Sequence, residues 1–261
     1  MAKVWDISAD PDAAIDAAAA AVAQGRCIVL PTDTVYGIGA DATDAAAVQG
    51  LLDAKERGRD MPPPVLIAEV GMLRALTDEV APAMLALADA FWPGALTLVV
   101  TAHPHLRMDL GERGASIAVR VPDHDFTRDL LRATGPLAVS SANVSGQPAA
   151  TTLAEAEAQL GERVEVYLDG GPTAGGIPST IVDLTGEPRI LREGLISRSA
   201  LAAVVPELAE PAELAESEPA EAAPEPALDP EADPSEPLPG LVETEDGELI
   251  VAPAAEGTGE A

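Results

Sequence analysis

Apolar and polar residues along the first two hundred positions recur in two periods, one typical of helices and one typical of strands. Helical spacing is found over 12–24, 44–55, 72–76, 82–91, 126–133 and 153–160. Strands are predicted by short apolar or alternating runs at 27–30, 65–67, 96–100, 117–121, 137–139, 164–168 and 180–184, with 189–191 as a further candidate. Interleaved helices and strands predict an α/β fold. Connections too short for a crossover helix predict an open, mixed parallel and antiparallel sheet.

Capping and stop signals bound several of these elements. Gly25 follows the first predicted helix, in the position where glycine often closes a helix. Thr43 is the predicted N-cap of the helix over 44–55. The sequence Trp92-Pro93-Gly94 ends the helix over 82–91, because proline cannot continue a helix.

The pattern ends near Ser199, where the composition changes. The chain has 261 residues and a formal charge of −29, and residues 201–261 hold 17 acidic residues, ten of the 24 prolines and no Lys or Arg. Such a segment buries too little apolar surface to offset the entropy of ordering. We therefore expect a folded domain over 1–200 and a disordered acidic tail over 201–261. Apolar alternation allows a hairpin over 241–251, which is marginal in isolation.

Charge and cysteine content narrow the class of protein. The expected domain holds 27 acidic residues against all 15 Lys and Arg, a net charge of −12. This argues against non-specific binding to nucleic acid or membranes, but leaves room for a local basic site. The start of the sequence lacks a signal-peptide pattern, no apolar run reaches the length of a membrane span, and Cys27 is the single cysteine. We expect a cytoplasmic protein without membrane contact.

The segment Lys55-Glu56-Arg57-Gly58-Arg59 concentrates positive charge at the end of a predicted helix. Cations there complement the helix dipole, which is a sufficient structural reason for them. The functional interpretation is a phosphate clamp, in which Lys supplies a compact charge and Arg a planar fork. The cluster alone leaves both interpretations open.

Three further segments carry small polar residues beside predicted strands, where α/β proteins often bind ligands. Residues 31–40 offer two Thr hydroxyls and a carboxylate, and residues 140–146 offer Ser hydroxyls and an Asn amide. Residues 170–180 are rich in glycine but lack the P-loop pattern. Ordinary turn chemistry explains each segment about as well as ligand binding does.

Metal and nucleophile chemistry find little support in the sequence. His103 and His105 could form half of a metal site, yet no third His or Cys lies near them, so we predict no metal site. His124 lies in a polar turn and is interpreted as structural. No Ser, His and Asp set has the spacing of a nucleophile elbow.

Taken in order, these segments resemble the YrdC-type threonylcarbamoyl-adenylate synthase family. The matching stretches are PTDTVYGIGADA at 31–42, Lys55 and Arg57 as a KxR pair, FWPGALTLV at 91–99, IAVRVPDH at 117–124, SSANVSG at 140–146, and PSTIVDLTG with ILREG at 178–194. Any one of these is unspecific, but six in register over about residues 10–198 make a strong match. The resemblance implies an open, twisted mixed sheet with flanking helices and a concave, positively lined pocket.

The resemblance also implies an activity and its residues. Members of the family join L-threonine, bicarbonate or CO2, and ATP into threonylcarbamoyl-adenylate and release pyrophosphate, with Mg²⁺ expected to share the phosphate charge. The product feeds the threonylcarbamoyladenosine modification of tRNA, through a downstream threonylcarbamoyl-transferase complex. By motif position, the implied threonine-binding residues are Thr32, Arg120 and Ser179. The implied ATP-binding residues are Lys55, Arg57, Arg59, Ser116, Ser141, Asn143 and Arg192.

The chain departs from the family pattern at several points. Asp33 stands where Glu is more usual. Residues 61–68 lack the His that lies near threonine in many members, so that contact is absent or replaced. The segment from 201 is too short for the second folded domain of some members, which predicts a single-domain form.

Two other interpretations stay open. A carbamoyl-transfer domain of the hydrogenase-maturation type shares the fold, but such domains sit in much longer chains with zinc-finger cysteines. An RNA-binding or ribosome-associated module could use the same concave surface, and a direct RNA contact belongs to this alternative. The net charge of −12 weakens it, because binding a nucleic-acid backbone needs several phosphate contacts.

Overall fold

The computed structural model describes residues 2–112, 114–174 and 176–209, together with the short strands β11 (Leu241–Glu243) and β12 (Leu249–Val251). By its internal contacts the chain divides into two units, Met1–Glu213 and Leu214–Ala261. The first unit contains every described helix and the large sheet. In the second unit β11 and β12 pair antiparallel, as expected for the hairpin over 241–251.

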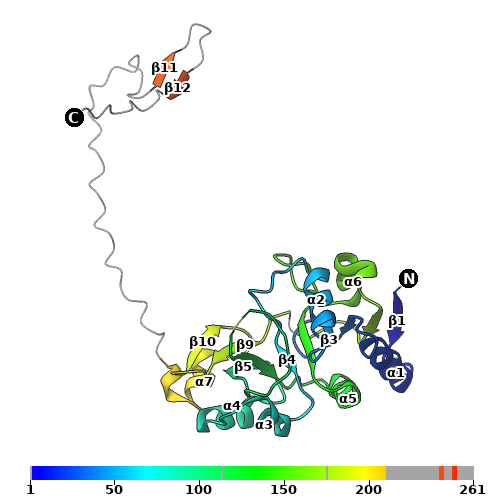
Figure 1. Ribbon diagram of the computed structural model, residues 1–261, viewed down its shortest axis with the longest axis horizontal. Coiled ribbons are helices and arrows are strands. Elements are labelled where there is room, and N and C mark those ends of the chain that lie inside the picture. The colour runs from blue at the N-terminus through cyan, green and yellow to red at the C-terminus, as the bar shows by residue number, and fades with distance from the viewer. Residues whose placement is uncertain (1, 113, 175, 210–240, 244–248, 252–261) are drawn as a thin grey trace, which may run out of the picture. The chain divides into compact units, whose positions relative to one another are not determined.

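A ten-stranded mixed sheet forms the centre of the first unit (Figure 1), with the order β1–β8–β2–β3–β7–β4–β6–β5–β9–β10. Four of its neighbouring pairs are parallel and five are antiparallel, which confirms the predicted mixed sheet. In chain order, β1 to β10 are Lys3–Asp6, Ile28–Leu30, Gly37–Asp41, Val65–Leu66, Leu96–Thr101, Ser116–Arg120, Leu137–Ser141, Val166–Asp169, Thr180–Asp183 and Arg189–Arg192.

Helices cover both faces of the sheet, because successive strand residues point to opposite sides. In β2, Ile28 and Leu30 pack with α1 and α5, whereas Val29 packs in the core that includes α2, α3, α4, α6 and α7. None of the described helices is long and apolar enough to cross a bilayer. Helices α1 to α7 are Pro11–Val22, Ala45–Ala54, Leu73–Leu76, Pro82–Phe91, Asp125–Thr134, Leu153–Leu160 and Arg198–Ala202.

The N-cap of α2 differs from the prediction. Asp44 occupies this position, and its carboxylate accepts hydrogen bonds from the N–H groups of Ala46 and Ala47 at 2.8 and 3.2 Å. The Thr43 hydroxyl instead donates to Asp41 at 2.7 Å. Both residue types cap helices well, so the sequence alone could not choose between neighbouring positions.

Strand β3 begins inside the segment 31–40, for which the sequence predicts a turn or a ligand-binding segment and no strand. A Cβ atom at Gly37 would lie 2.6 Å from Cγ1 of Val139, and one at Gly39 would lie 3.1 Å from Cδ2 of Leu30. The glycines therefore allow β3 to pack closely against side chains of its neighbours in the sheet, β2 and β7. Their low strand propensity hides the strand in the sequence.

The folded core extends past the expected domain boundary at residue 200. Helix α7 crosses that boundary, and Leu201, Val205 and Leu208 are exposed by only 0, 4 and 1%. These side chains join the core that includes α2 to α4, so the boundary lies at least eight residues later than predicted. Residues 210–240, 244–248 and 252–261, and with them most of the predicted tail, lie outside the described residues.

Candidate functional site

Arg120 ends β6, and its guanidinium group is buried against the loop between β2 and β3. Nε donates to the Gly94 carbonyl oxygen at 2.9 Å, Nη1 to the Thr34 hydroxyl at 3.0 Å, and Nη2 to the Asp33 carboxylate at 2.6 Å. Burial lowers the pKa of Arg120, and the neighbouring charge of Asp33 opposes this shift. The anionic partner that a buried arginine requires is thus supplied by the protein itself.

Thr32 lies in the same loop and shapes its turn. Its hydroxyl donates to the Val35 carbonyl oxygen at 2.6 Å and lies 3.0 Å from the Thr34 hydroxyl. Because Thr34 also contacts Arg120, the structure joins Thr32 and Arg120 through one intervening side chain. Two of the three predicted threonine-binding residues therefore lie together.

Ser179 and Arg192 form a second group, at the paired strands β9 and β10. Arg192 donates to the Ser179 carbonyl oxygen at 2.8 Å, and the Ser179 hydroxyl lies 2.9 Å from the Thr97 hydroxyl. Partial burial lowers the pKa of Arg192, and the positive charge of Arg120 lowers it further. Two guanidinium groups therefore lie within electrostatic range of each other. Among the described acidic residues, none forms an ion pair with Arg192.

Lys55 and Arg57 contact the end of β7 and the residue Asn143 that follows it. Lys55 is 2% exposed, and its Nζ donates to the carbonyl oxygens of Ser141 and Asn143, the latter at 2.7 Å. Arg57 donates through Nη1 to the Ser140 hydroxyl at 3.0 Å. Burial, followed by the charge of Arg57, lowers the pKa of Lys55 to about 8. Four of the predicted ATP-binding residues, Lys55, Arg57, Ser141 and Asn143, thus form one group.

Two predicted ATP-binding residues are placed differently. Arg59 forms an ion pair with Asp109 and donates to the Gln49 side-chain oxygen at 3.0 Å. Ser116 begins β6, opposite Thr101 of β5, and so lies at the other end of that strand from Arg120. The structure does not bring these two side chains together with the Arg120 group.

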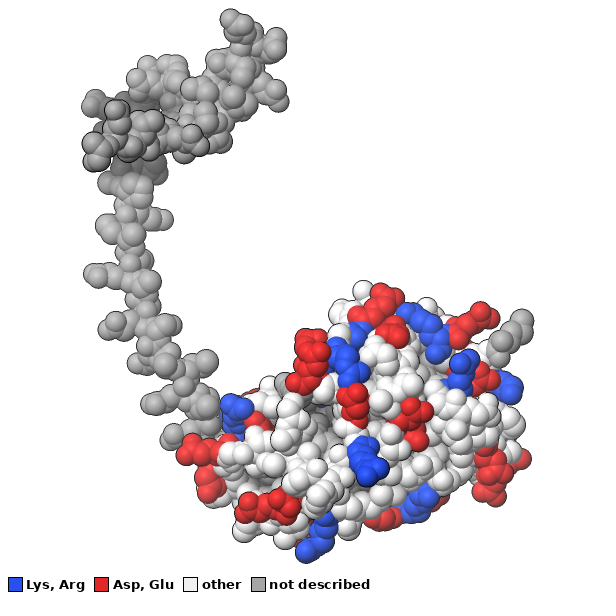
Figure 2. All heavy atoms as spheres, viewed as in Figure 1, with Lys and Arg blue, Asp and Glu red and all other residues white. Residues whose placement is uncertain are grey.

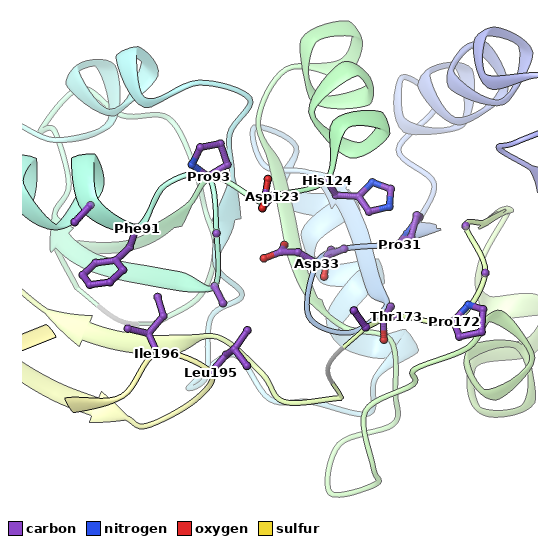
Figure 3. Close-up of a pocket in the computed structure, with 17 residues that line it drawn as sticks. Pro31, Asp33, Phe91, Pro93, Asp123, His124, Pro172, Thr173, Leu195 and Ile196 are labelled. Atoms are coloured by element: carbon purple, nitrogen blue, oxygen red, sulfur yellow. The ribbon is translucent and has the colours of Figure 1, made fainter. Parts of the chain in front are cut away.

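A cavity of about 680 Å³ opens beside the Arg120 group. Figure 3 shows Asp33 and Asp123 near its centre, with Phe91, Leu195 and Ile196 on one side and Pro172 and Thr173 on the other. The expected positive lining is not found here: the charged residues among the described lining are carboxylates, beside His124. The other lining residues are Pro31, Thr32, Ala90, Pro93, Gly94, Ala95, Gly170, Gly171 and Ala174.

His124 has a structural role and also lines this cavity. Its Nδ1 accepts a hydrogen bond from the Thr127 N–H at 3.3 Å, which caps α5. Burial lowers the pKa of His124, an effect opposed by nearby carboxylates including Asp33. The structural role agrees with the prediction from the polar turn, whereas the cavity was not predicted, because it depends on the distant segments 91–95 and 170–174 meeting residue 124.

Sequence comparison identifies relatives over most of the chain. Residues 20–194 match the profile of the Sua5/YciO/YrdC family, described as "Telomere recombination". A Mycobacterium leprae protein provisionally named threonylcarbamoyl-AMP synthase is 52% identical over 209 residues, which cover 78% of this chain and 94% of the relative. The threonylcarbamoyl-AMP synthase of Bacillus subtilis is 36% identical over 205 residues, covering 77% of this chain and 59% of that protein.

Solved structures agree with the sequence relatives. A double variant of Sua5 from P. abyssi matches with a TM-score of 0.75 and 33% identity, over 78% of this chain and 60% of that chain. The complex of P. abyssi Sua5 with L-threonine matches with a TM-score of 0.71 and 35% identity, over 74% of this chain and 57% of that chain. The protein therefore belongs to the Sua5/YciO/YrdC family.

Proposed function

We propose that this protein is an L-threonylcarbamoyl-adenylate synthase, which joins threonine, bicarbonate or CO2, and ATP and releases pyrophosphate. Family membership and the near full-length match to the M. leprae relative support the proposal. Within the structure, the buried Arg120 guanidinium carries it, because two of its hydrogen-bond partners, Asp33 and Gly94, line the cavity. Arg192, which forms no ion pair with a described carboxylate, adds a guanidinium group that favours an anionic ligand.

We assign threonine to Thr32, Arg120 and Ser179. Arg120 uses three of its five N–H donors for Gly94, Thr34 and Asp33. Two donors remain for the substrate carboxylate, which would share the guanidinium with Asp33. The cavity wall formed by Thr32 and Asp33 adjoins this position.

We assign ATP to the group at Arg192 and to the group at the end of β7. Arg57, Ser141, Asn143 and Lys55 form the second of these, and their shared contacts support a common role. Arg59 and Ser116 stay predictions, and Arg59 would have to leave Asp109 to reach a nucleotide.

Magnesium is expected to enter with ATP. This ion usually binds through one or two carboxylates together with substrate phosphates, and Asp123 at the cavity wall fits that role. The described part of the chain holds no cluster of three or more His, Cys, Asp or Glu side chains suited to a metal ion. When bound, it would neutralise phosphate charge.

The proposed reaction needs positioning more than a strong base. The amine of threonine, after loss of a proton, attacks CO2 to form a carbamate with release of a second proton. A carbamate oxygen then attacks the α-phosphorus of ATP, and the bond to the β-phosphate bridging oxygen breaks so that pyrophosphate leaves. Because the nucleophile is already anionic, guanidinium and hydroxyl groups that orient it and neutralise charge suffice.

The RNA-binding alternative gains no support from the described surface. On the face shown in Figure 2, Lys and Arg are interspersed with Asp and Glu. Arg26, Arg128, Arg132, Arg163 and Arg189 each pair with an acidic side chain, which reduces the charge available to phosphates. We therefore expect the product to pass to a threonylcarbamoyl-transferase complex in the cytoplasm.

Pyrophosphate release provides the test. The purified protein should release pyrophosphate only when threonine, bicarbonate and ATP are all present, and serine or valine in place of threonine should support much slower release. Release that does not depend on threonine would contradict the proposal. Arg120→Lys should raise the KM for threonine more than that for ATP, because lysine lacks the planar fork.

A further inference from the structure

Thr97 places a hydroxyl group in the middle of the apolar strand β5. Its neighbours Leu96 and Leu98 are fully buried and point to the opposite face of the sheet. Thr97 is itself only 1% exposed, and its Oγ1 lies 2.9 Å from the Ser179 Oγ. Among the described residues, Ser179 is the one hydrogen-bond partner of this hydroxyl. Valine would fill the same position without a polar atom to satisfy, so packing alone does not account for the hydroxyl group.

The backbone around Ser179 is held by other contacts. Arg192 donates to the Ser179 carbonyl oxygen through Nε at 3.2 Å and through Nη2 at 2.8 Å. The Thr180 N–H donates to the Ala95 carbonyl oxygen at 2.9 Å, and the Thr180 hydroxyl donates to the Ile196 carbonyl oxygen at 2.7 Å. The freedom that remains to Ser179 is therefore rotation of its side chain and of its hydroxyl hydrogen.

The direction of the hydrogen bonds at the Ser179 hydroxyl follows from its partners. Nη2 of Arg192 lies 3.3 Å from the Ser179 Oγ and can only donate, so it occupies one lone pair of that oxygen. Between the two hydroxyls either oxygen could donate, but an unpaired hydroxyl hydrogen costs more where it is more deeply buried. Thr97 is 1% and Ser179 is 6% exposed, which favours Thr97 as the donor. The Ser179 hydrogen is then left for a ligand.

We propose that Thr97 is a positioning residue, whose hydroxyl donates to Ser179 and thereby directs the Ser179 hydroxyl hydrogen at an acceptor oxygen of the bound threonine. The inference rests on the proposed function, in which Ser179 binds threonine. Thr97 and Arg192 would occupy both lone pairs of the Ser179 oxygen, so that this hydroxyl can act only as a donor to the substrate. Thr97 itself would not touch the substrate.

Threonine binding by four proteins tests the proposal. Calorimetry compares the wild type, Thr97→Val, Ser179→Ala and the double variant. Thr97→Val should raise the Kd for threonine roughly three- to tenfold, because the hydrogen bond from Ser179 loses its fixed direction. In the Ser179→Ala background the same change should alter the Kd by less than about twofold. An equal loss in both backgrounds would overturn the proposal, because Thr97 would then act without the Ser179 hydroxyl.

Further variants separate positioning from packing. Thr97→Ser restores the hydroxyl and should bring the Kd for threonine to within about twofold of wild type. Thr101→Val makes the same change at an exposed position of β5, and this matched control should leave the Kd unchanged. If Thr97→Ser binds threonine as weakly as Thr97→Val does, packing is responsible and the proposal is wrong. Where Thr97→Val does not fold, Thr97→Ala takes its place in the cycle.

Nucleotide binding shows whether the effect is confined to threonine. The Kd for ATP should be the same in Thr97→Val and in the wild type, since Arg192 keeps its contact with the Ser179 carbonyl oxygen. Equal weakening of ATP and threonine would show a general disturbance of the site and contradict the positioning role.

The synthase proposal and the positioning role fail separately. A wild-type protein that binds threonine but releases no pyrophosphate contradicts the synthase proposal, and the binding cycle still decides the role of Thr97. An active synthase in which Thr97→Val binds threonine as tightly as the wild type does contradicts the positioning role alone. A folded wild-type protein that binds no threonine contradicts both.

Discussion

The Arg120 guanidinium and the Asp33 carboxylate form a 2.6 Å ion pair in which the side chains are only 8 and 14% exposed. The pair joins the end of β6 to the loop between β2 and β3, and that loop carries Thr32. Removing one partner from a buried pair leaves an uncompensated charge, which costs more than removing both. Asp33 therefore orients Arg120 and compensates its buried charge before any substrate arrives.

A double-mutant cycle measures this pair. Asp33→Ala should lower the free energy of unfolding by about 3 kcal/mol or more, because Arg120 stays buried without its anion. The double variant with Arg120→Met should lose less than the sum of the two single changes. Urea unfolding of the four proteins provides the values. Additive losses would show that the pair contributes no coupling.

Alanine substitution should change the free energy of unfolding in opposite directions at Gly37 in β3 and at Gly50 in α2. Gly37→Ala places a Cβ 2.6 Å from Val139, so we expect a loss of about 1–3 kcal/mol in the free energy of unfolding. Gly50→Ala, within α2 and with no atom nearby, should gain about 0.5–1 kcal/mol. Thermal unfolding compares them. Equal melting temperatures for the two variants would refute the close packing at β3.

Truncation locates the end of the folded unit. A chain ending at residue 200 lacks Leu201, Val205 and Leu208, each of which contributes about 1.5–3 kcal/mol by burial. It should melt far below the full chain, whereas a chain ending at residue 209 should melt close to it. Calorimetry of the three lengths decides this. Equal melting of the two truncated forms would return the boundary to residue 200.

The sequence predicts elements with local signals and misses those that depend on distant partners. Helices α4 and α6 have the predicted bounds, because a proline begins one and a Thr152–Glu155 capping box begins the other. Strand β1 was not predicted. Its residues are mostly exposed, and its partner strand β8 (Val166–Asp169) is far from it in the sequence. Its place is set by tertiary contacts rather than by local pattern.

The candidate site likewise combines features that the sequence predicts with features that depend on tertiary contacts. The cost of burying Arg120 in an apolar strand predicts an anionic partner, but nothing in the spacing of the sequence identifies Asp33. The Lys55 cluster was equally compatible with a helix-end role and a phosphate clamp. Its contacts with Ser141 and Asn143 appear only once the fold brings the end of α2 to the end of β7.

The lowered pKa of Lys55 predicts a pH-dependent stability difference. Its pKa falls from 10.5 to about 8 on folding, so the unfolded chain holds this proton over a range in which the folded protein has released it. Stability rises with pH wherever the unfolded state binds more protons. The stability of wild type relative to Lys55→Met should therefore increase as pH rises from about 8 to about 10. A difference that stays constant would contradict the shift.

The synthase assignment is tested most directly by detecting its product. Protein incubated with threonine, ATP and carbon-13-labelled bicarbonate should yield threonylcarbamoyl-adenylate carrying one labelled carbon, seen by mass spectrometry together with equimolar pyrophosphate. Arg120→Lys should give less product at the same protein concentration while remaining folded. A folded, ATP-binding wild-type protein that forms no labelled adduct would contradict the account.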